Sequence, residues 1–378
     1  MKKIQLIFVL LLTASLGISQ NFETLSFGTD TKLDIMSWNI EWFPKDEYST
    51  PDDVSSIIEA LEPDIIAIQE IDDTTVFKDM VDAMPDYEYS IYSSYFMGLA
   101  YIYKPASVQV TSIYEIYTEY EYWNTFPRSP LVMEFTYKGE AFTLLNNHLK
   151  CCGDGEIDMG NSDDEEYRRY MAVELLEEWI SMEKPNDRVI LVGDLNDVLT
   201  DEAANNVFQF FLDTPAEYLF TDMLIAEGND AYWSYPTWPS HLDHIMITDE
   251  LFDAYSNSGS ECSTILVDEA YSSYSDYDES VTDHRPVGLT LELNQTASEI
   301  AGISKVKVYP NPARSSITIT APERGSSFRL INSTGACVLQ GTIDSKRMKL
   351  DISKFKSGIY SLETSNGTKV FRTKLIKY

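Results

Sequence analysis

Residues that can do acid–base or metal chemistry recur in this sequence at one kind of position, the boundary of an apolar segment. The packing of a buried strand does not need Asn, Gln, Glu, His or Asp at its end, whereas loops at one edge of a sheet are where functional sites collect. The polar boundaries comprise Asn39, Gln69-Glu70, His148, Asp194-Leu-Asn196, Asp243 and Asp283-His284. The pattern predicts one site assembled from several strand ends.

The histidines follow the same pattern. The chain of 378 residues has only four, and all of them lie in such segments: His148, His241, His244 and His284. Four histidines with no shared purpose would be scattered over the surface, so their concentration favours a site. His241 and His244 flank Asp243, and we expect both to be structural or peripheral rather than catalytic.

Six of these segments resemble, in order, the motifs of the endonuclease/exonuclease/phosphatase superfamily. One match would be weak evidence, but six in the family's order are strong. They are Ser37-Trp-Asn-Ile-Glu41, Ile68-Gln-Glu70, Asn147-His-Leu-Lys150, Val192-Gly-Asp-Leu-Asn196, Leu242-Asp-His244 and Thr282-Asp-His-Arg-Pro286. The resemblance implies an α/β fold, a four-layer sandwich of two packed mixed sheets flanked by helices.

The resemblance also implies a metal centre. Hydrolysis of a phosphodiester requires charge neutralisation on the phosphate and a positioned water, and carboxylate and amide oxygens hold Mg²⁺ or Mn²⁺. On the family pattern Glu70 is the principal metal ligand, assisted by Asn39 and Asp283. Asp194 orients or deprotonates the attacking water, and Asn196 holds the phosphate or a second metal.

Two histidines and two arginines complete the implied site. His284 contacts the phosphate and exchanges protons, while Asp243 holds its other ring nitrogen. His148 occupies the second histidine position, but the sequence has no acid at Met97-Gly98-Leu99 to support it, which favours phosphate binding over an acid role. Arg128 and Arg168 resemble positions that touch phosphate or brace the site; surface ion pairing is the alternative.

The elements that must position these residues alternate between strand and helix. Apolar strands are expected at 33–39, 64–70, 142–148, 188–194, 242–247 and 285–293. A helix is expected after Thr50, which would be its N-cap, and another over 165–184. The acidic segment 271–280 reads as a loop. The body is therefore predicted to be mixed α/β.

Charge divides the chain into unequal parts. Residues 301–378 carry 14 Lys and Arg and four acids, a formal charge of +10, whereas residues 21–300 carry −45. The acidic body excludes an ordinary basic nucleic-acid coat protein. We expect a signal peptide over 1–19, a catalytic domain over 20–296, a linker over 297–304 and a tail domain over 305–378.

Both ends carry export features. Lys2-Lys3 precede an apolar run, Ile4 to Leu12, and small residues follow, as in a cleaved secretory signal. A membrane anchor is the alternative, but the run is short against the roughly 20 residues that a bilayer requires. No later segment is apolar enough to span a membrane.

The tail resembles the type IX secretion sorting domain, in Tyr309-Pro-Asn-Pro312, Asn332-Ser-Thr-Gly335, Ser357-Gly-Ile-Tyr360 and the basic end Lys374-Leu-Ile-Lys-Tyr378. Its short alternating strands predict a small all-β sandwich. The resemblance implies the type IX secretion machinery as a partner and a secreted or surface location. An adhesive or carbohydrate-binding module is the alternative.

Three further features leave alternatives open. Export permits disulfides, and one of Cys151 and Cys152 is expected to bridge to Cys262, with a vicinal bridge as the alternative and Cys337 left free. The acidic segment 151–164 could hold a structural Ca²⁺ or be a solvated loop. The aromatic segment 232–239 could stack on bases, although core packing is the expected role.

These observations predict an exported, divalent-metal-dependent phosphodiester hydrolase, most simply a nuclease that takes nucleic acid as substrate. A phosphatase or phospholipid phosphodiesterase of the same superfamily is the alternative within the enzyme class. An inactive, surface-displayed binding protein is the alternative from another class.

Overall fold

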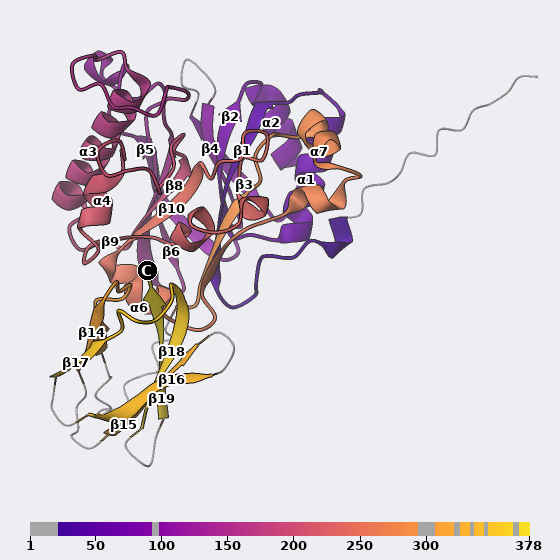
Figure 1. The fold of residues 1–378 in the computed structure, drawn as a ribbon. Helices are drawn as coiled ribbons and strands as arrows, with labels where there is room; N and C mark the ends of the chain where they lie inside the picture. The colour runs from indigo at the N-terminus through magenta and orange to yellow at the C-terminus, as the bar shows by residue number, and fades with distance from the viewer. Residues whose placement is uncertain are drawn as a thin grey trace, which may run out of the picture.

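The computed structural model describes residues 22–92, 98–293, 307–320, 326–332, 336–343, 347–365 and 370–378. The expected signal peptide and linker lie outside these ranges. The described part contains a body of two packed six-stranded sheets with helices on both outer faces, and a tail made of two small sheets (Figure 1). The expected α/β four-layer sandwich, followed by an all-β tail, is confirmed.

The first sheet, sheet A, has the strand order β11-β12-β1-β2-β4-β3. Its strands are β1 (Leu33–Phe43), β2 (Ile65–Ile71), β3 (Glu88–Tyr92), β4 (Gly98–Tyr103), β11 (Glu261–Thr264) and β12 (Val287–Leu291). Strands β1 and β2 run parallel, and the other pairs are antiparallel. The helix that joins β1 to β2 makes their parallel pairing possible.

The second sheet, sheet B, has the order β5-β6-β7-β8-β10-β9. Its strands are β5 (Val108–Glu115), β6 (Leu131–Tyr137), β7 (Glu140–His148), β8 (Val189–Asp194), β9 (Tyr218–Phe220) and β10 (Asp243–Thr248). Here β7 and β8 form the parallel pair, connected by the long helix of the body. The two sheets therefore repeat the same strand–helix–strand unit.

Helices close the two outer faces of the sandwich. Sheet A is covered by α1 (Ser49–Leu61), α2 (Thr74–Asp82) and α7 (Tyr274–Ser280), and sheet B by α3 (Glu165–Glu183), α4 (Gln209–Asp213) and α5 (Met223–Ala226). The short α6 (Phe252–Tyr255) lies at the end nearest the tail (Figure 1). Single 3₁₀ turns are η1 (Phe22–Thr24), η2 (Tyr120–Tyr122), η3 (Asp230–Tyr232), η4 (Asp249–Leu251) and η5 (Val267–Ala270).

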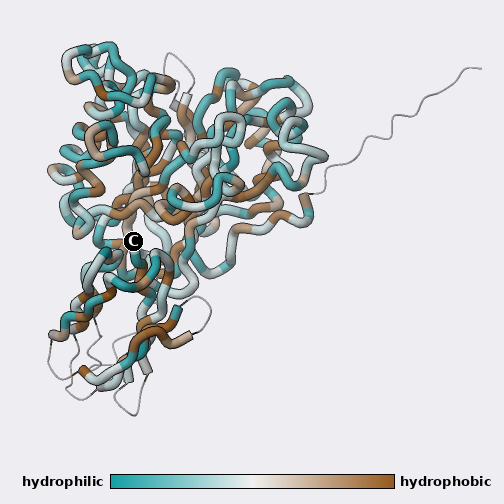
Figure 2. Tube along the Cα trace, viewed as in Figure 1, coloured by the Kyte–Doolittle hydropathy of each residue, from teal (hydrophilic) through white to brown (hydrophobic). Residues whose placement is uncertain are grey.

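Side-chain alternation along the strands builds the core. In β1, Leu33 and Ile35 face the other sheet, whereas Met36 and Trp38 face the helices, as the two-residue period of a strand requires. The apolar residues are correspondingly concentrated inside the body (Figure 2). Three apolar layers result, one between the sheets and one under each set of helices.

Two local predictions were wrong. Thr50 lies inside α1 rather than at its N-cap, because its hydroxyl instead donates to the carbonyl of Ser280, at 2.8 Å. The segment expected to be an acidic loop forms α7, capped by Ser273, and buries Tyr277 against sheet A. Its aromatic residues face the core while its acids face solvent, so the helix tolerates the charge.

The expected disulfide is also wrong, because all four cysteines are free. Cys151 and Cys152 follow β7, whereas Cys262 lies on β11, an edge strand of the other sheet. The Sγ atoms of Cys151 and Cys152 lie 3.0 Å apart and are not bonded. The shared location of these cysteines in the acidic body could not reveal this separation, because the order of the strands decides which sheet each cysteine is on.

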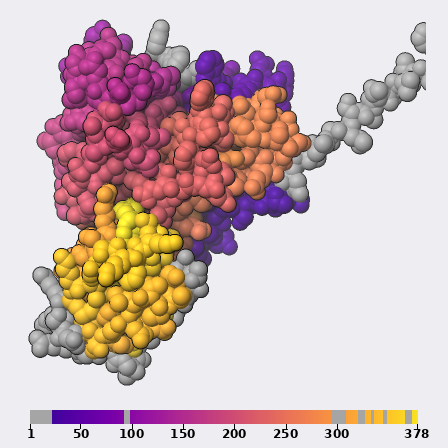
Figure 3. Space-filling model, in the orientation of Figure 1, coloured from indigo at the N-terminus to yellow at the C-terminus, as the bar shows by residue number. Residues whose placement is uncertain are grey.

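The tail packs a three-stranded sheet, β13 (Lys307–Tyr309), β14 (Ser316–Thr320) and β17 (Arg347–Asp351), on a four-stranded one, β15 (Ser326–Asn332), β16 (Cys337–Ile343), β18 (Gly358–Ser365) and β19 (Val370–Lys377). It forms a separate lobe against one end of the body (Figure 3). Lys374 Nζ donates to the carbonyl of Ser260, at 2.8 Å, and Tyr378 packs against the apolar layer of sheet B.

Candidate active site

The alternation of side chains that builds the core also determines which way the polar residues at the strand ends point. Asn39, Gln69, His148, Asp194 and Asp243 lie on the same side of their strands as the apolar residues that fill the layer between the sheets. For example, Ile190 and Val192 fill the layer between the sheets, and Asp194 is the next residue on that side of β8. These polar side chains therefore end the inter-sheet layer, where the apolar residues stop.

Strand register then brings them together. His148 pairs with Asp194 across β7 and β8, and Asp194 pairs with Asp243 across β8 and β10, so the three lie in one row on sheet B. On sheet A, Asn39 pairs with Gln69 across β1 and β2, and His284 precedes the neighbouring β12. The two rows face each other.

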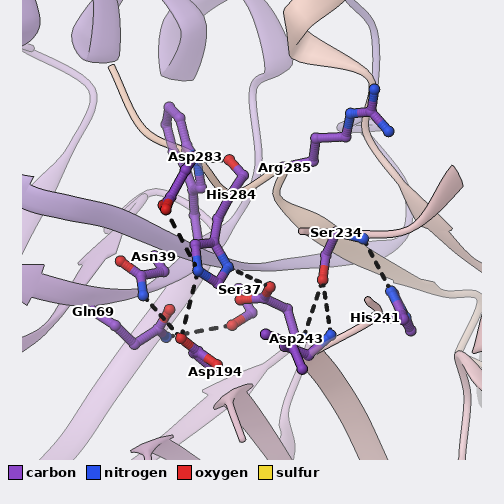
Figure 4. A network of polar contacts seen from close by, with 12 residues as sticks. Ser37, Asn39, Gln69, Asp194, Ser234, His241, Asp243, Asp283, His284 and Arg285 are labelled. Atoms are coloured by element: carbon purple, nitrogen blue, oxygen red, sulfur yellow. Dashed lines mark hydrogen bonds and ion pairs between the residues drawn. The ribbon is translucent and has the colours of Figure 1, made fainter. Parts of the chain in front are cut away.

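Asp194 is the centre of the resulting cluster (Figure 4). Its Oδ2 accepts a hydrogen bond from Asn39 Nδ2 at 2.9 Å and lies 3.5 Å from His148 Nε2 and 3.7 Å from His284 Nε2. Burial raises the pKa of the Asp194 carboxyl to about 6, against the charge of His284, which lowers it. A carboxylate with this pKa can exchange protons near neutral pH.

Asp243 and His284 form a buried pair. Asp243 Oδ2 accepts the Nδ1–H of His284 at 2.7 Å, and the hydroxyl of Ser234 holds the backbone N–H of Asp243. Burial disfavours a charged imidazole, but the carboxylates of Asp243 and Asp194 outweigh it and hold the pKa of His284 well above its usual range. His284 therefore presents a protonated Nε2 to the centre of the cluster.

His148 is the neutral counterpart of His284. Burial, together with the positive charges of Arg128 and His284, holds its pKa well below the usual range. Its Nε2 lies 3.7 Å from Glu70 Oε1, and its Nδ1 has no hydrogen-bond partner among the described residues.

The loop after β8 has the backbone shape that the site needs. Gly193 has φ 143°, and a Cβ there would meet the carbonyl oxygen of Asn147 at 1.8 Å, so only glycine fits. Asn196 has φ 55°; its N–H binds Asp194 Oδ1 at 3.0 Å, and its Nδ2 donates to the carbonyl of Leu149. One Asp194 oxygen thus fixes the loop while the other faces the cluster.

Glu70 projects from a distorted part of β2. Its φ is 65°, its Oε1 accepts from Asn39 Nδ2 at 3.1 Å, and its Oε2 accepts from the backbone N–H of Trp42 at 3.2 Å. Asn39 Oδ1 is occupied by the N–H of Glu41, so Asn39 presents its amide nitrogen to the two carboxylates. Asn39 thereby holds Glu70 and Asp194 together.

Asp283 lies beside His284, with its Oδ1 3.8 Å from Nε2 of that ring, the same nitrogen that faces Asp194. Burial, reinforced by the nearby Glu41 carboxylate, raises the pKa of Asp283 to about 7, although His284 acts in the opposite direction. Two residues that we did not single out support this corner. Glu41 accepts the Asp283 N–H at 2.9 Å, and the Tyr235 ring packs on His284 with centroids 4.8 Å apart.

A signal for Glu41 was present, because it closes the Trp-Asn-Ile-Glu motif two residues after Asn39. No comparable signal marks Tyr235, which reaches the site from the aromatic segment 232–239. That segment is divided in the structure: Ser234 is buried and Tyr235 half-buried, whereas Trp238 is 76% exposed. Core packing therefore describes only part of it.

Three arginines lie at different positions relative to this cluster. Arg128 is buried, and the charges of Glu70 and Asp194 act on it. Arg168 instead donates to the carbonyl of Asn124 and braces the loop before β6. Its neighbour Arg169, which we did not single out, is buried and binds Asp197 at 2.8 Å and the carbonyls of Lys150 and Cys152.

The cluster has the donor set of a divalent-metal centre. One ligand atom each from Glu70, His148 and Asp194 can lie within 4.8 Å of the others. Buried Oδ1 atoms of Asp243 and Asp283 have no hydrogen-bond partner among the described residues, and such atoms call for a cation, a ligand or water. Oxygen-rich sites of this kind suit Mg²⁺ or Mn²⁺.

A second His–Asp group lies on the other face of β10. Asp222 Oδ2 binds His244 Nδ1 at 2.6 Å and His241 Nε2 at 3.1 Å. His244 Nε2 donates to the carbonyl of Asp197 at 2.8 Å, and His241 Nδ1 accepts from the N–H of Ser234. Because every ring nitrogen has a partner, this group has no open ligand position.

The acidic segment after β7 gathers three carboxylates. Oxygens of Asp154, Asp164 and Glu166 lie within 4.8 Å of one another. Asp164 caps α3, and Glu166 binds Arg169 at 3.2 Å and the N–H of Gly155 at 2.7 Å. These contacts give the acids structural roles, and a Ca²⁺ at this place stays a prediction.

No helix among the described residues is both long enough and apolar enough to cross a membrane.

Solved structures of other proteins are similar to this chain in fold. D. rerio TDP2 with a single-strand DNA product has 15% identity and a TM-score of 0.52, over 70% of this chain and 100% of that chain. Humanised D. rerio TDP2 has 15% identity and a TM-score of 0.50, over 69% of this chain and 99% of that chain. The human Nocturnin catalytic domain has 16% identity and a TM-score of 0.49, over 69% of this chain and 93% of that chain. At such identities the likeness shows the fold alone. No curated protein matches the chain in sequence.

Sequence profiles of two families match the chain. Residues 307–378 match the secretion system C-terminal sorting domain, which indicates a secreted or surface protein of the type IX route. Residues 36–284 match the endonuclease/exonuclease/phosphatase family, whose members are metal-dependent hydrolases of phosphate esters. The chain belongs to the endonuclease/exonuclease/phosphatase family.

Proposed function

We propose that the protein is a secreted, divalent-metal-dependent phosphodiesterase that cleaves nucleic acid. The observation that carries the proposal is the buried cluster around Asp194. It combines carboxylates able to hold a metal, a charged and a neutral histidine, and buried oxygens that have no hydrogen-bond partner within the described part of the chain. A structural site would use these oxygens internally, so their availability favours a bound cation, and the charged His284 favours a negatively charged ligand beside it.

The metal would be held by Glu70, with Asp283 nearby and Asn39 keeping the Glu70 and Asp194 carboxylates in place. When bound, it would supply positive charge to the phosphate and the leaving oxygen. Mg²⁺ and Mn²⁺ both accept this oxygen-rich donor set. The nearby Arg128 adds a second, permanent positive charge.

The side chains have complementary roles in the reaction. Asp194 accepts a proton from the attacking water, for which its pKa of about 6 suits it. Asn196 contacts the phosphate. His284 donates from Nε2 to a phosphate or leaving oxygen, and Asp243 keeps the ring charged and correctly oriented. His148, being neutral, can hydrogen-bond the phosphate without competing with the metal for charge.

Nucleic acid is the proposed substrate, and the fold relative crystallised with a single-strand DNA product supports it. The body carries 12 Lys and Arg against 57 Asp and Glu, which weakens electrostatic attraction to a polyanion. That charge is the specific reason to keep a phosphatase or phospholipid phosphodiesterase as the second candidate. We further propose that a signal peptide over 1–19 starts export and that the tail domain completes it.

The test incubates the full mature chain with plasmid and single-stranded DNA in Mg²⁺ or Mn²⁺, with EDTA as a blank. We expect metal-dependent cleavage that Glu70→Gln lowers about 1,000-fold, equivalent to roughly 4 kcal/mol of barrier. Glu59→Gln, an exposed acid on α1, is the matched control and should cleave normally. Cleavage of phosphomonoesters or phospholipids alone would favour the second candidate. No turnover of any phosphate ester would indicate an inactive binding protein.

A further inference from the structure

An irregular pairing of β1 with β2 lies directly beside Glu70. Asn39 pairs with Gln69 and Phe43 with Ile71, so three residues of β1, Ile40 to Trp42, stand opposite Glu70 alone. Bulges of this kind redirect side chains and are common next to active sites. In this bulge Glu41 has φ 28° and Trp42 has φ 52°.

Two residues of the bulge hold acidic residues of the site. The Trp42 N–H donates to Glu70 Oε2, and the Glu41 carboxylate receives the N–H of Asp283. Neither contact uses the Trp42 side chain. A glycine would adopt φ 52° without steric cost and would keep the same N–H, whereas a bulky residue in this region is unfavourable.

The Trp42 indole is nevertheless left in solvent. Its exposed fraction is 63%, whereas Trp38, four residues earlier on the same strand, is fully buried. An exposed large apolar ring in an unfavourable backbone conformation gains nothing from core packing. The backbone N–H of Trp42 binds Glu70 Oε2 at 3.2 Å, so this exposed ring belongs to a residue that directly adjoins the Glu70 carboxylate.

A flat apolar ring at such a place suits the face of a nucleobase. Base–aromatic stacking contributes roughly a 5- to 150-fold gain in affinity per base and needs no positive charge. This matters here because the body has few cations to bind a phosphate backbone. Bases within a duplex have their faces covered by neighbouring pairs, so only an unpaired base is available to the ring.

We propose that Trp42 stacks on an unpaired base next to the scissile phosphate and makes the enzyme selective for single-stranded nucleic acid. The proposal rests on the proposed nuclease function. Trp42 is a specificity residue in this account, because it contacts the base and not the reacting atoms.

The test compares three substrates with the same cleavable phosphate: a single-stranded oligonucleotide, the same strand with abasic residues on both sides of that phosphate, and the duplex. The measured quantity is the ratio of kcat/KM between substrates. We expect the wild type to favour the base-containing strand over the abasic strand by about 10- to 100-fold. Trp42→Leu and Trp42→Gly should bring the ratio towards one, and Trp42→Phe should retain part of it.

Two controls separate stacking from folding and from chemistry. Phe210→Leu removes another exposed aromatic residue, on α4, and should leave the ratio unchanged. Trp42→Gly keeps the N–H that binds Glu70 and relieves the backbone, so it should remain folded. In the Glu70→Gln background, the single strand should quench tryptophan fluorescence, and Trp42→Phe should abolish that quenching.

The outcomes distinguish the two proposals. Equal cleavage of base-containing and abasic strands by the wild type overturns stacking but leaves the nuclease function intact. So does a Trp42→Leu variant that slows both strands equally, which would mean that Trp42 acts through Glu70. Preference for the duplex also overturns single-strand selection. Failure of the wild type to cleave any strand removes the nuclease function and the stacking proposal together.

Discussion

Strand β10 separates two groups that look alike in composition and differ in every contact. Asp243 faces the layer between the sheets and pairs with His284, whereas the next residue, His244, faces the helices and pairs with Asp222. Both groups combine histidine with a buried aspartate. Asp222 forms a potential metal-binding cluster with His241 and His244, whereas Asp243 and His284 adjoin the cluster of Glu70, His148 and Asp194. We call them the Asp243 group and the Asp222 group.

The two groups differ in whether their polar atoms already have hydrogen-bond partners. In the Asp222 group both carboxylate oxygens and all four ring nitrogens have partners, since Oδ1 accepts the N–H of Ile245. His244 meets an acceptor at each nitrogen and is therefore charged; Asp222 holds its pKa above the usual value against the effect of burial. In the Asp243 group, Asp243 Oδ1 has no partner among the described residues.

This contrast gives a criterion that composition cannot supply. A satisfied group of charges stabilises the fold, and a group with buried atoms left over is built for something that binds. The Asp222 group also has a positional effect, because His244 holds the carbonyl of Asp197 just beyond the Asp194 loop. Variants in the two groups should therefore change different observables.

The largest effect should come from His284→Gln. Loss of the charged ring next to Asp194 should lower kcat about 1,000-fold, roughly 4 kcal/mol, because general acid–base groups contribute on this scale. Steady-state kinetics at saturating Mn²⁺ measures it. His241→Gln, in the Asp222 group, is the counterpart and should keep kcat within about twofold at low temperature. A His284 variant within tenfold of wild type would contradict the proposed role.

Asp222→Asn should produce the largest loss of stability. Removing the charge leaves the buried His244 imidazolium uncompensated, so the free energy of unfolding should fall by about 3 kcal/mol. Urea denaturation measures it, and Asp230→Asn, an exposed acid on η3, is the control. An equal loss in both variants would mean that the pair is not a stabilising unit.

The pH dependence of that loss follows from His244. Its pKa is raised in the folded state, so the pair's stabilisation is complete below the unfolded value of 6.5 and is lost as pH rises through the folded pKa. The wild type should therefore exceed Asp222→Asn by more at pH 5.5 than at pH 9. The opposite trend would show that His244 is neutral in the folded protein.

Asp283→Asn should give a smaller effect of opposite sign. The pKa of Asp283 is raised to about 7 from 3.8, so in the absence of metal the folded protein holds a costly carboxylate above pH 7. The variant should be more stable than wild type by about 2 kcal/mol at pH 8.5 in EDTA, and by nothing below pH 3.8, where the group is protonated in both states. Thermal unfolding in EDTA measures it, and added Mn²⁺ should stabilise the wild type more than the variant.

The sequence by itself determined much of the fold. Short apolar strands that alternate with helices predicted a mixed α/β body, and polar residues at the strand boundaries marked the segments of the site. The sandwich of two sheets was implied by the resemblance of six motifs to a known family. Charge separated the body from the tail, because composition differs sharply between them. Hydrophobic pattern and charge are properties of short segments, so they can be read from the sequence without knowledge of the fold.

Only the tertiary structure decided how neighbouring residues divide their roles. Asp243 and His244 differ by one position, and strand register alone assigns one to the site and the other to the Asp222 group. Arg169 rather than Arg168 is buried beside Asp197, and Cys262 lies on the sheet opposite Cys151. The bulge that exposes Trp42 has no sequence signal either, since it arises from the pairing of β1 with β2. The pairing of distant strands determines which polar atoms have hydrogen-bond partners. A buried charge whose atoms all have partners stabilises the fold, whereas one with an atom left over can bind a ligand.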